Sequence, residues 1–316
     1  MIITVTLNPA LDKTARVDVM RPNALNRLRD VQVDAGGKGV NVSAMIRALG
    51  GASVAVGFAG GGAGEELLSR IAGKGLKADF VRVAALTRTN VKVVDKDGAL
   101  TELNEPGPEI KPAEWREMEN KLSHYGVPGN TVALSGSLPA SLGTDTYKRL
   151  CVLLRRAGAA VFLDADGEAL KHALQLEPDS IPDYIKPNRF ELLHYFGIPD
   201  DERVPEARLA ELCRSLIDKG VKLVALSMGG EGAIFASKNG VWRAAAIPVE
   251  ARSTVGAGDS MVGALIYGFE QGLYEEQRFV LAMAASAGAC ATAGTNPPDR
   301  ALVDELLQKT RIEKTA

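Results

Sequence analysis

A short segment near residue 256 combines glycines, one carboxylate and the start of an apolar run. It reads Thr254-Val255-Gly256-Ala257-Gly258-Asp259-Ser260 and continues into small and apolar residues from 261 to 269. The glycines let the chain turn with its N–H groups exposed, and a helix that begins there adds the positive end of its dipole. The segment therefore predicts an anion site beside the carboxylate of Asp259. The simpler alternative is that Asp259 only caps the first turn of that helix.

Five other polar segments are candidates for the same site: 8–12, 35–41, 135–139, 186–191 and 227–232. Most of them follow strand-like sequence, and ligands of open parallel sheets bind at the carboxyl ends of strands. Segment 35–41 offers N–H groups, the ammonium of Lys38 and the amide of Asn41 to hydroxyl or phosphate oxygens. Asn188 and Glu191 are three residues apart on one predicted helical face, which suits holding water on Mg²⁺. Taken singly, each segment is more often an ordinary turn.

Two common nucleotide-binding motifs are absent from the sequence. A P-loop needs Ser or Thr after its lysine, whereas Lys38 is followed by Gly39. A dinucleotide fingerprint needs Gly-x-Gly-x-x-Gly after the first strand, whereas that strand ends in Leu7-Asn8-Pro9-Ala10. The sequence therefore excludes a P-loop NTPase and a dehydrogenase that binds a dinucleotide through this fingerprint.

Apolar runs of strand length alternate with helical spacing along most of the chain. Such runs are found at 2–7, 53–58, 131–135, 160–164, 183–185 and 222–226, and strands near 232–236 and 241–246 precede helices near 257–271 and 276–293. This order predicts an α/β fold with a mainly parallel sheet. Segments 13–34 and 78–104 lack helical spacing, and we expect them to form hairpins that pair into one small sheet off the main body. No repeat or linker divides residues 1–316, so we expect a single domain.

Composition indicates which kinds of partner and which cellular compartment to expect. The chain has 316 residues, 46% of them hydrophobic and 24% charged, with a net charge of −2 and no basic stripe, so we expect no nucleic-acid partner. No apolar run reaches the length of a membrane span, so we expect no membrane partner. Three distant cysteines, Cys151, Cys213 and Cys290, indicate a reducing compartment. With an N-terminal segment that lacks a basic leader, these features predict a cytoplasmic protein.

Taken together and in this order, the segments resemble the ribokinase-like, PfkB-type carbohydrate kinase family over essentially the whole chain. The block from Thr254 to Ser260 is highly specific to that family. Residues 4–12, 87–90 and 253–268 are most similar to its phosphosugar branch. The resemblance implies a ribokinase-like three-layer α/β/α fold in which the two insertions form a β lid over the sugar.

The resemblance also implies an activity, which is ATP-dependent phosphorylation of a ketohexose phosphate. Fructose 1-phosphate is the favoured substrate, and tagatose 6-phosphate and fructose 6-phosphate are the alternatives. Asp259 would be the base, and the N–H groups of Gly256, Ala257 and Gly258 would form the anion hole for the γ-phosphate. Mg²⁺ would be held largely through water by Asn188 and Glu191. The residues implied to contact ATP are Lys186, Ser227, Gly229, Gly232 and Thr254.

At the sugar end, the phosphate already on the substrate calls for a fixed cation. Arg88 is the first choice because a guanidinium can hold a phosphate with two parallel hydrogen bonds. The expected helpers are Arg27, Asn90 and Ser137, and the residues expected on the furanose hydroxyls are Asp12, Gly37, Lys38 and Asn41. Lids of this family often pair between subunits, which implies a homodimer. A monovalent cation such as K⁺ near the anion hole is also compatible with the resemblance.

One segment departs from the family pattern, and one other function class stays open. Asp164-Ala165-Asp166 occupies a place where relatives often carry serines after the strand aspartate, so its contacts are not predicted. A non-catalytic sugar-phosphate sensor could have kept the fold and lost the chemistry. A missing base or a broken anion hole would favour a sensor, and the sequence retains both features.

Overall fold

The computed structural model describes residues 1–199 and 203–315. Its large sheet has the strand order β15-β14-β13-β12-β11-β10-β9-β1-β4-β5, with β6 also paired to β4. The parallel strands are β1 (Ile2–Thr6), β4 (Ser53–Ala59), β5 (Lys77–Ala78), β6 (Val81–Arg82), β9 (Thr131–Ser135), β10 (Ala160–Asp164), β11 (Tyr184–Ile185) and β12 (Leu223–Ser227). Antiparallel strands β13 (Ala233–Ser237), β14 (Gly240–Ala244) and β15 (Ile312–Lys314) complete one edge. The predicted, mainly parallel sheet is confirmed.

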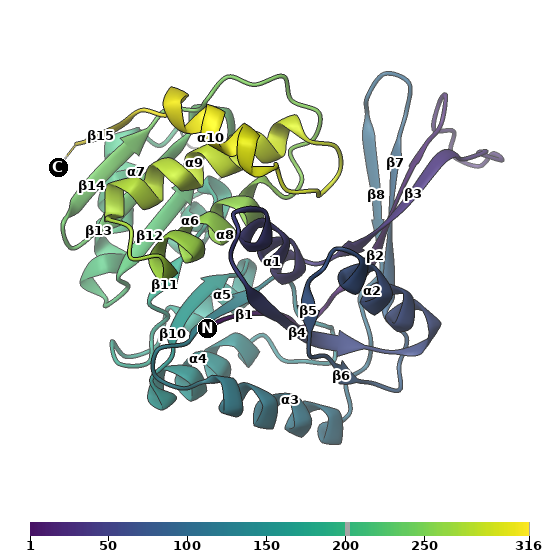
Figure 1. Cartoon of the computed structure of the whole chain (residues 1–316), viewed down its shortest axis with the longest axis horizontal. Coiled ribbons are helices and arrows are strands. Elements are labelled where there is room, and N and C mark those ends of the chain that lie inside the picture. Colours follow the sequence, from purple (N-terminus) through teal and green to yellow (C-terminus); the bar gives the residue numbers. More distant parts are fainter. Residues whose placement is uncertain (200–202, 316) are drawn as a thin grey trace.

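Helices cover both faces of this sheet because successive side chains of its strands point to opposite sides. On β9, Val132 and Leu134 join one apolar cluster, and Ala133 joins the other. The first cluster includes α3 (Pro112–Tyr125), α4 (Thr146–Ala157), α5 (Gly167–Ala173), α6 (Arg189–Tyr195) and α7 (Glu206–Asp218). The second includes α1 (Lys38–Ala48), α8 (Ala257–Glu270), α9 (Glu275–Ala291) and α10 (Arg300–Lys309), which gives the predicted three layers (Figure 1).

None of the helices in the described ranges combines the length and the apolar composition that a membrane crossing requires.

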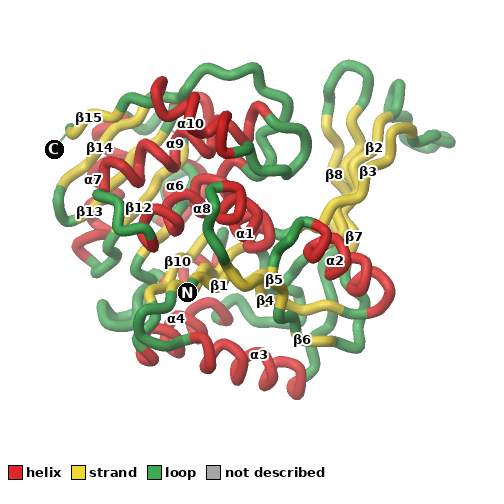
Figure 2. The backbone as a smooth tube through the Cα atoms, in the orientation of Figure 1, coloured by secondary structure: helices red, strands yellow, loops and turns green. Residues whose placement is uncertain are grey.

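A second, four-stranded sheet projects from the body, as Figure 2 shows at the upper right. It consists of hairpins β2 (Ala10–Arg16) with β3 (Arg29–Gly36) and β7 (Arg88–Val94) with β8 (Leu100–Asn104), joined by parallel pairing of β2 with β7. Helix α2 (Gly61–Gly73) packs beneath it through Leu67 and Ile71. The prediction that both insertions pair into one small sheet is confirmed.

The predicted bounds of the two insertions need correction. Residues 77–82 belong to the large sheet, because β5 and β6 pair with β4 and Val81 is fully buried in the main core. The first insertion is longer than predicted, since β2 begins at Ala10 and β3 ends at Gly36. Asp12 therefore lies on a strand of the small sheet and not in a loop.

Local chemistry explains the tight turn of the second hairpin. Oδ1 of Asp95 accepts hydrogen bonds from the N–H groups of Asp97 and Ala99, and Gly98 adopts a φ of 83°. The side chain thus replaces backbone partners within the turn, which is the usual role of Asp in such positions.

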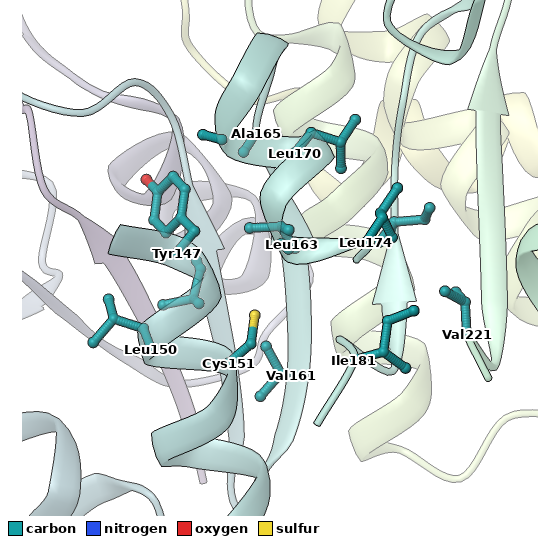
Figure 3. Packing of buried hydrophobic residues seen from close by; sticks show 14 of the residues in the cluster. Tyr147, Leu150, Cys151, Val161, Leu163, Ala165, Leu170, Leu174, Ile181 and Val221 are labelled. Atoms are coloured by element: carbon teal, nitrogen blue, oxygen red, sulfur yellow. The ribbon is translucent and has the colours of Figure 1, made fainter. Parts of the chain in front are cut away.

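Tyr147 links the main core to the loop that follows β9. Figure 3 shows its ring among the side chains of α4 and β10, together with Cys151, Val161 and Leu163. Its hydroxyl donates a hydrogen bond of 2.8 Å to the buried carbonyl of Gly136. The core therefore fixes the backbone at the carboxyl end of β9.

Substitution of Tyr147 by Phe tests this link. The Gly136 carbonyl would stay buried without its donor, so we expect the free energy of unfolding in urea to fall by about 1–2 kcal/mol. Tyr274, which is 81% exposed, supplies the control, and its change to Phe should have little effect. Equal stability of Tyr147→Phe and the parent would contradict the link.

Candidate active site

A cavity of about 720 Å³ lies between the carboxyl ends of the parallel strands and the small sheet. Its walls come from segments far apart in the sequence, including β1, β2, β8, β10 and the start of α8. It collects most of the residues predicted for the site: Asp12, Gly37, Lys38, Asn41, Arg88, Asn90, Ser137, Lys186, Asn188, Glu191, Ser227, Gly256, Gly258 and Asp259. The sequence thus predicted the location of the cavity.

The start of α8 brings N–H groups and a carboxylate together. Gly256 precedes the helix with a φ of 84°, a left-handed conformation that favours glycine, and Ala257 is the first helical residue. Asp259 lies in the first turn and is only 7% exposed, and its Oδ2 accepts a hydrogen bond of 2.8 Å from Nδ2 of Asn41 on α1. Burial and the nearby charge of Asp164 raise the pKa of Asp259 to about 6. Asp259 is therefore mostly ionised at neutral pH and basic enough to accept a proton.

A buried carboxylate between two lysines lies next to this helix. Oδ1 of Asp164 is 3.3 Å from Nζ of Lys38 and 3.4 Å from Nζ of Lys186, and Asp164 itself is 2% exposed. Burial alone would raise the pKa of Asp164, but the two ammonium groups lower it below its usual range. Nζ of Lys186 is 3.1 Å from the point where a Cβ on Gly258 would lie. An ammonium group therefore lies beside the N–H groups of the α8 terminus.

The role of Asp164 was missed in the sequence analysis. Its signal was its place as the last residue of a predicted strand, at the edge of the sheet where the other candidate residues meet. Asp166 also lines the cavity. Asn8, Glu102 and Asn104 line it as well, although no individual role was predicted for them. Alternation along β8 places Glu102 and Asn104 on one face, but only the small sheet as a whole shows that this face meets the cavity.

Asn188 and Glu191 are joined by two reciprocal hydrogen bonds at the start of α6. Oδ1 of Asn188 accepts from the N–H of Glu191, and Oε2 of Glu191 accepts from the N–H of Asn188, each at 2.8 Å. Asn188 therefore caps the helix and does not share a helical face with Glu191 as predicted. Burial raises the pKa of Glu191. Across the described residues, no group of three or more His, Cys, Asp or Glu side chains is arranged to hold a metal ion directly.

Arg88 lines the same cavity as Asp259, at a point where three loops meet. Its Nη1 donates to the carbonyl of Glu105, and its Nη2 donates to the carbonyl of Asn8, both at 3.0 Å. Oγ of Ser137 is 3.5 Å from Nη2. Nε of Arg88 is buried and has no hydrogen-bond partner in the part of the chain that the structure describes. A half-buried guanidinium with an unused, buried donor is suited to an anionic ligand.

Some predicted residues lie elsewhere. Arg27 is exposed in the loop between β2 and β3 and does not line the cavity. Gly229 and Gly232 form the turn after β12, outside the lining. Thr254 lines an adjoining cavity of about 560 Å³, which shares Asp12, Val255 and Thr295 with the first.

Comparison with known proteins decides the family. The model of the pfkB family carbohydrate kinases matches residues 5–301. The chain belongs to the pfkB family of carbohydrate kinases. This carbohydrate kinase is therefore a phosphotransferase whose acceptor is a sugar hydroxyl.

Individual relatives agree with this assignment. The carbohydrate kinase is 39% identical to a 1-phosphofructokinase of Rhodobacter capsulatus, over 95% of this chain and 94% of the relative. Its structure is similar to that of phosphofructokinase-2 from Escherichia coli in complex with substrates and products, with a TM-score of 0.91, 27% identity and 98% coverage of both chains. A ribokinase from Thermotoga maritima gives a TM-score of 0.76 at 22% identity, over 98% of this chain and 99% of that one. The last likeness shows the fold alone, and the predicted ribokinase-like fold is confirmed.

Replacing Asp259 by Asn tests the base. We expect turnover to fall at least about a hundredfold, the usual scale for a positioned base. For the parent, kcat/KM should rise with pH through about 6, because the proton acceptor is the ionised carboxylate. Near-normal turnover of the variant would remove Asp259 from this role.

The stability of the same variant serves as its control. The pKa of Asp259 in the folded protein, about 6, is above its ordinary value of 3.8, so the folded state binds the proton more tightly than the unfolded state. This carboxyl group therefore contributes most to stability below its ordinary pKa, and the contribution is lost as the pH rises through about 6. At neutral pH, Asp259→Asn should resist urea as well as the parent or better, which separates loss of the base from unfolding.

Proposed function

We propose that this carbohydrate kinase uses ATP to convert fructose 1-phosphate to fructose 1,6-bisphosphate. The observation that carries the proposal is the presence of two features in one cavity, which we take as its two ends: half-buried Arg88, and Asp259 with the N–H groups of α8. The first end suits a phosphate already on the sugar, and the second suits transfer to a hydroxyl. The name of the Rhodobacter capsulatus relative supports fructose 1-phosphate as the substrate.

In the proposed reaction, Asp259 accepts the proton of the attacking hydroxyl. The N–H groups of Gly256, Ala257, Gly258 and Asp259 bind the charge that develops on the transferred phosphoryl group, and the ammonium of Lys186 adds to this attraction. The residues that bind the furanose hydroxyls are Asp12, Gly37, Lys38 and Asn41. Arg88, Asn90 and Ser137 hold the phosphate already present.

The ATP end has oxygen donors that fit Mg²⁺. Mg²⁺ prefers oxygen ligands and keeps part of its water shell, and it would neutralise charge on the ATP phosphates. Oδ2 of Asp164 is buried without a hydrogen-bond partner among the described residues, so this oxygen is unpaired and could accept from water bound to a cation. Asn188 and Glu191 would hold the ion through water, and Ser227, Gly229, Gly232 and Thr254 would flank the nucleotide. Oγ1 of Thr295, buried and likewise without a partner in the described ranges, supports the K⁺ proposal.

The small sheet is proposed to act as a lid and to pair with the lid of a second subunit. Its strands and loops expose large apolar side chains, with exposed fractions from 37% to 77%: Val19, Met20, Leu25, Leu28, Val31, Leu100 and Leu103. Such a surface is typical of a protein contact. Arg27 lies in this exposed loop, so it would help to bind a phosphate only across that interface. We place the homodimer in the cytoplasm, with no nucleic-acid or membrane partner.

A substrate panel tests the proposed function. Purified protein with Mg-ATP is assayed on fructose 1-phosphate, fructose 6-phosphate and tagatose 6-phosphate, with free fructose and ribose as controls. The highest kcat/KM on fructose 1-phosphate is expected. A higher kcat/KM on either 6-phosphate would make that sugar the substrate in place of fructose 1-phosphate. Binding of a sugar without turnover of any of them would favour the non-catalytic sugar-phosphate sensor.

Arg88→Ala separates a phosphosugar kinase from a kinase of free sugars. We expect binding of the phosphosugar to weaken by about 2–5 kcal/mol, the range for losing one partner of a desolvated charge pair. The KM for ATP and the weak turnover of free fructose should change little. Arg88→Lys should recover only part of the loss, because an ammonium cannot form the two-pronged contact. If the preference for phosphorylated sugar survives in Arg88→Ala, the phosphate binds elsewhere, with Arg27 or Lys38 the next candidates.

Glu191→Gln tests the metal end. Glutamine keeps an oxygen for the N–H of Asn188, so the helix cap survives while the charge is lost. We expect a higher Mg²⁺ concentration at half-maximal activity, by about tenfold. Glu114→Gln, in the corresponding cap of α3 and outside the cavity, is the matched control. An unchanged Mg²⁺ titration would leave Glu191 as a helix cap only.

A further inference from the structure

The cavity has an unfavourable charge balance for its proposed ligands, and the inference drawn here rests on the proposed function. Six acidic side chains and three basic ones line it: Asp12, Glu102, Asp164, Asp166, Glu191 and Asp259 against Lys38, Arg88 and Lys186. Both proposed substrates carry phosphate. Each buried carboxylate near them must therefore be neutralised, or it repels the ligand.

For Asp164 and Asp259, neighbouring groups or a raised pKa reduce the negative charge. Asp164 lies against the ammonium groups of Lys38 and Lys186. Asp259 has a raised pKa and a hydrogen bond from Asn41. Asp12, at the sugar end, needs a different partner.

The partner of Asp12 is Lys92, on the neighbouring strand β7. Nζ of Lys92 is 3.2 Å from Oδ2 of Asp12, and Nδ2 of Asn90 donates to Oδ1 at 2.9 Å. The side chains of Lys92 and Asp12 are only 12% and 10% exposed. On the other side, a Cβ on Gly36 would lie 2.5 Å from Cγ of Asp12, so the carboxylate fills the space that glycine leaves. Asp12 is thus fixed in place, and both of its oxygens are held by β7.

Lys92 lies behind Asp12 and not on the substrate side. It lines the adjoining cavity of about 560 Å³ but not the active-site cavity, whereas Asp12 lines both. The nearest other carboxylate is Glu102, at 4.0 Å. Lys92 therefore compensates Asp12 without contacting the substrate.

We propose that Lys92 is a specificity-determining residue for the phosphorylated sugar. By neutralising Asp12, it lets a doubly charged phosphosugar approach a carboxylate that is needed for the sugar hydroxyls. A neutral sugar gains little from this compensation, since it has no charge for Asp12 to repel. Lys92 thus sets the preference between charged and neutral substrates through Asp12.

The test compares kcat/KM for fructose 1-phosphate with kcat/KM for free fructose. Lys92→Met keeps the length of the side chain and removes its charge, so we expect the ratio of the two values to fall at least about tenfold. Lys92→Arg keeps the charge and should retain most of the ratio. Lys96→Met, at the exposed end of the same hairpin, should leave both activities unchanged. The loss in Lys92→Met should change little with salt, because ions screen a charge as buried as that of Asp12 only weakly.

A second substitution separates charge compensation from packing. Asp12→Asn added to Lys92→Met removes the uncompensated carboxylate, so the ratio should return toward that of the parent even though both activities are lower. Urea unfolding of each variant shows whether the fold is intact. An unchanged ratio in Lys92→Met, equal losses for both sugars, or a double variant no better than Lys92→Met would each overturn the inference. If the parent itself phosphorylates no phosphosugar, the proposed function fails and the role of Lys92 fails with it, whereas a parent that prefers fructose 1-phosphate and an unchanged ratio in Lys92→Met overturn the role of Lys92 alone.

Discussion

The structure depends on the burial of carboxylates in a cavity that must accept phosphates. In water a carboxylate and a phosphate would repel each other weakly. In a buried site the repulsion is strong, so each carboxylate must be neutralised by a positively charged or hydrogen-bonding side chain held next to it. Asp164 is met by Lys38 and Lys186, which come from α1 and from the end of β11. Asp12 is met by Lys92 and Asn90 from the small sheet. These pairs explain why segments so far apart in sequence converge at one edge of the large sheet.

The carboxylates of the cavity also differ in their surroundings and in their pKa values. Among the described residues, no ammonium group is in direct contact with Asp259, and its pKa rises to about 6, which suits a proton acceptor. Asp164 is held ionised by two lysines and has little capacity to take up a proton. The same type of side chain is therefore suited to act as a base in one place and to hold two ammonium groups in another. The difference comes from the surroundings alone.

Much of this could be predicted from the sequence because it depends on local patterns. Apolar runs gave the strands, and the Gly256-Ala257-Gly258-Asp259 segment gave the helix start and its carboxylate. Lys92 and Glu102 could not be predicted in this way, since on an isolated hairpin they resemble any solvated pair. Their role follows only from the parallel pairing of β2 with β7, which no local pattern indicates. For Asn188 a local pattern misled the prediction. A helix cap and the third helical residue are three positions apart, which is also the spacing of two residues on one helical face, and here Asn188 is the cap.

The way the small sheet is built has a consequence for the order of folding. Its two hairpins meet only through residues such as Asp12 and Asn90, which are 78 positions apart, and the base Asp259 meets Asn41 across 218 positions. Contacts of such separation form late, because the intervening chain must first be closed into a loop. During synthesis, the sugar end can therefore assemble only after β7 has emerged, and the transfer end only after α8 has. A nascent chain thus carries the residues proposed for the sugar end before it carries Asp259 and the start of α8, so the proposed transfer end is the later of the two to form.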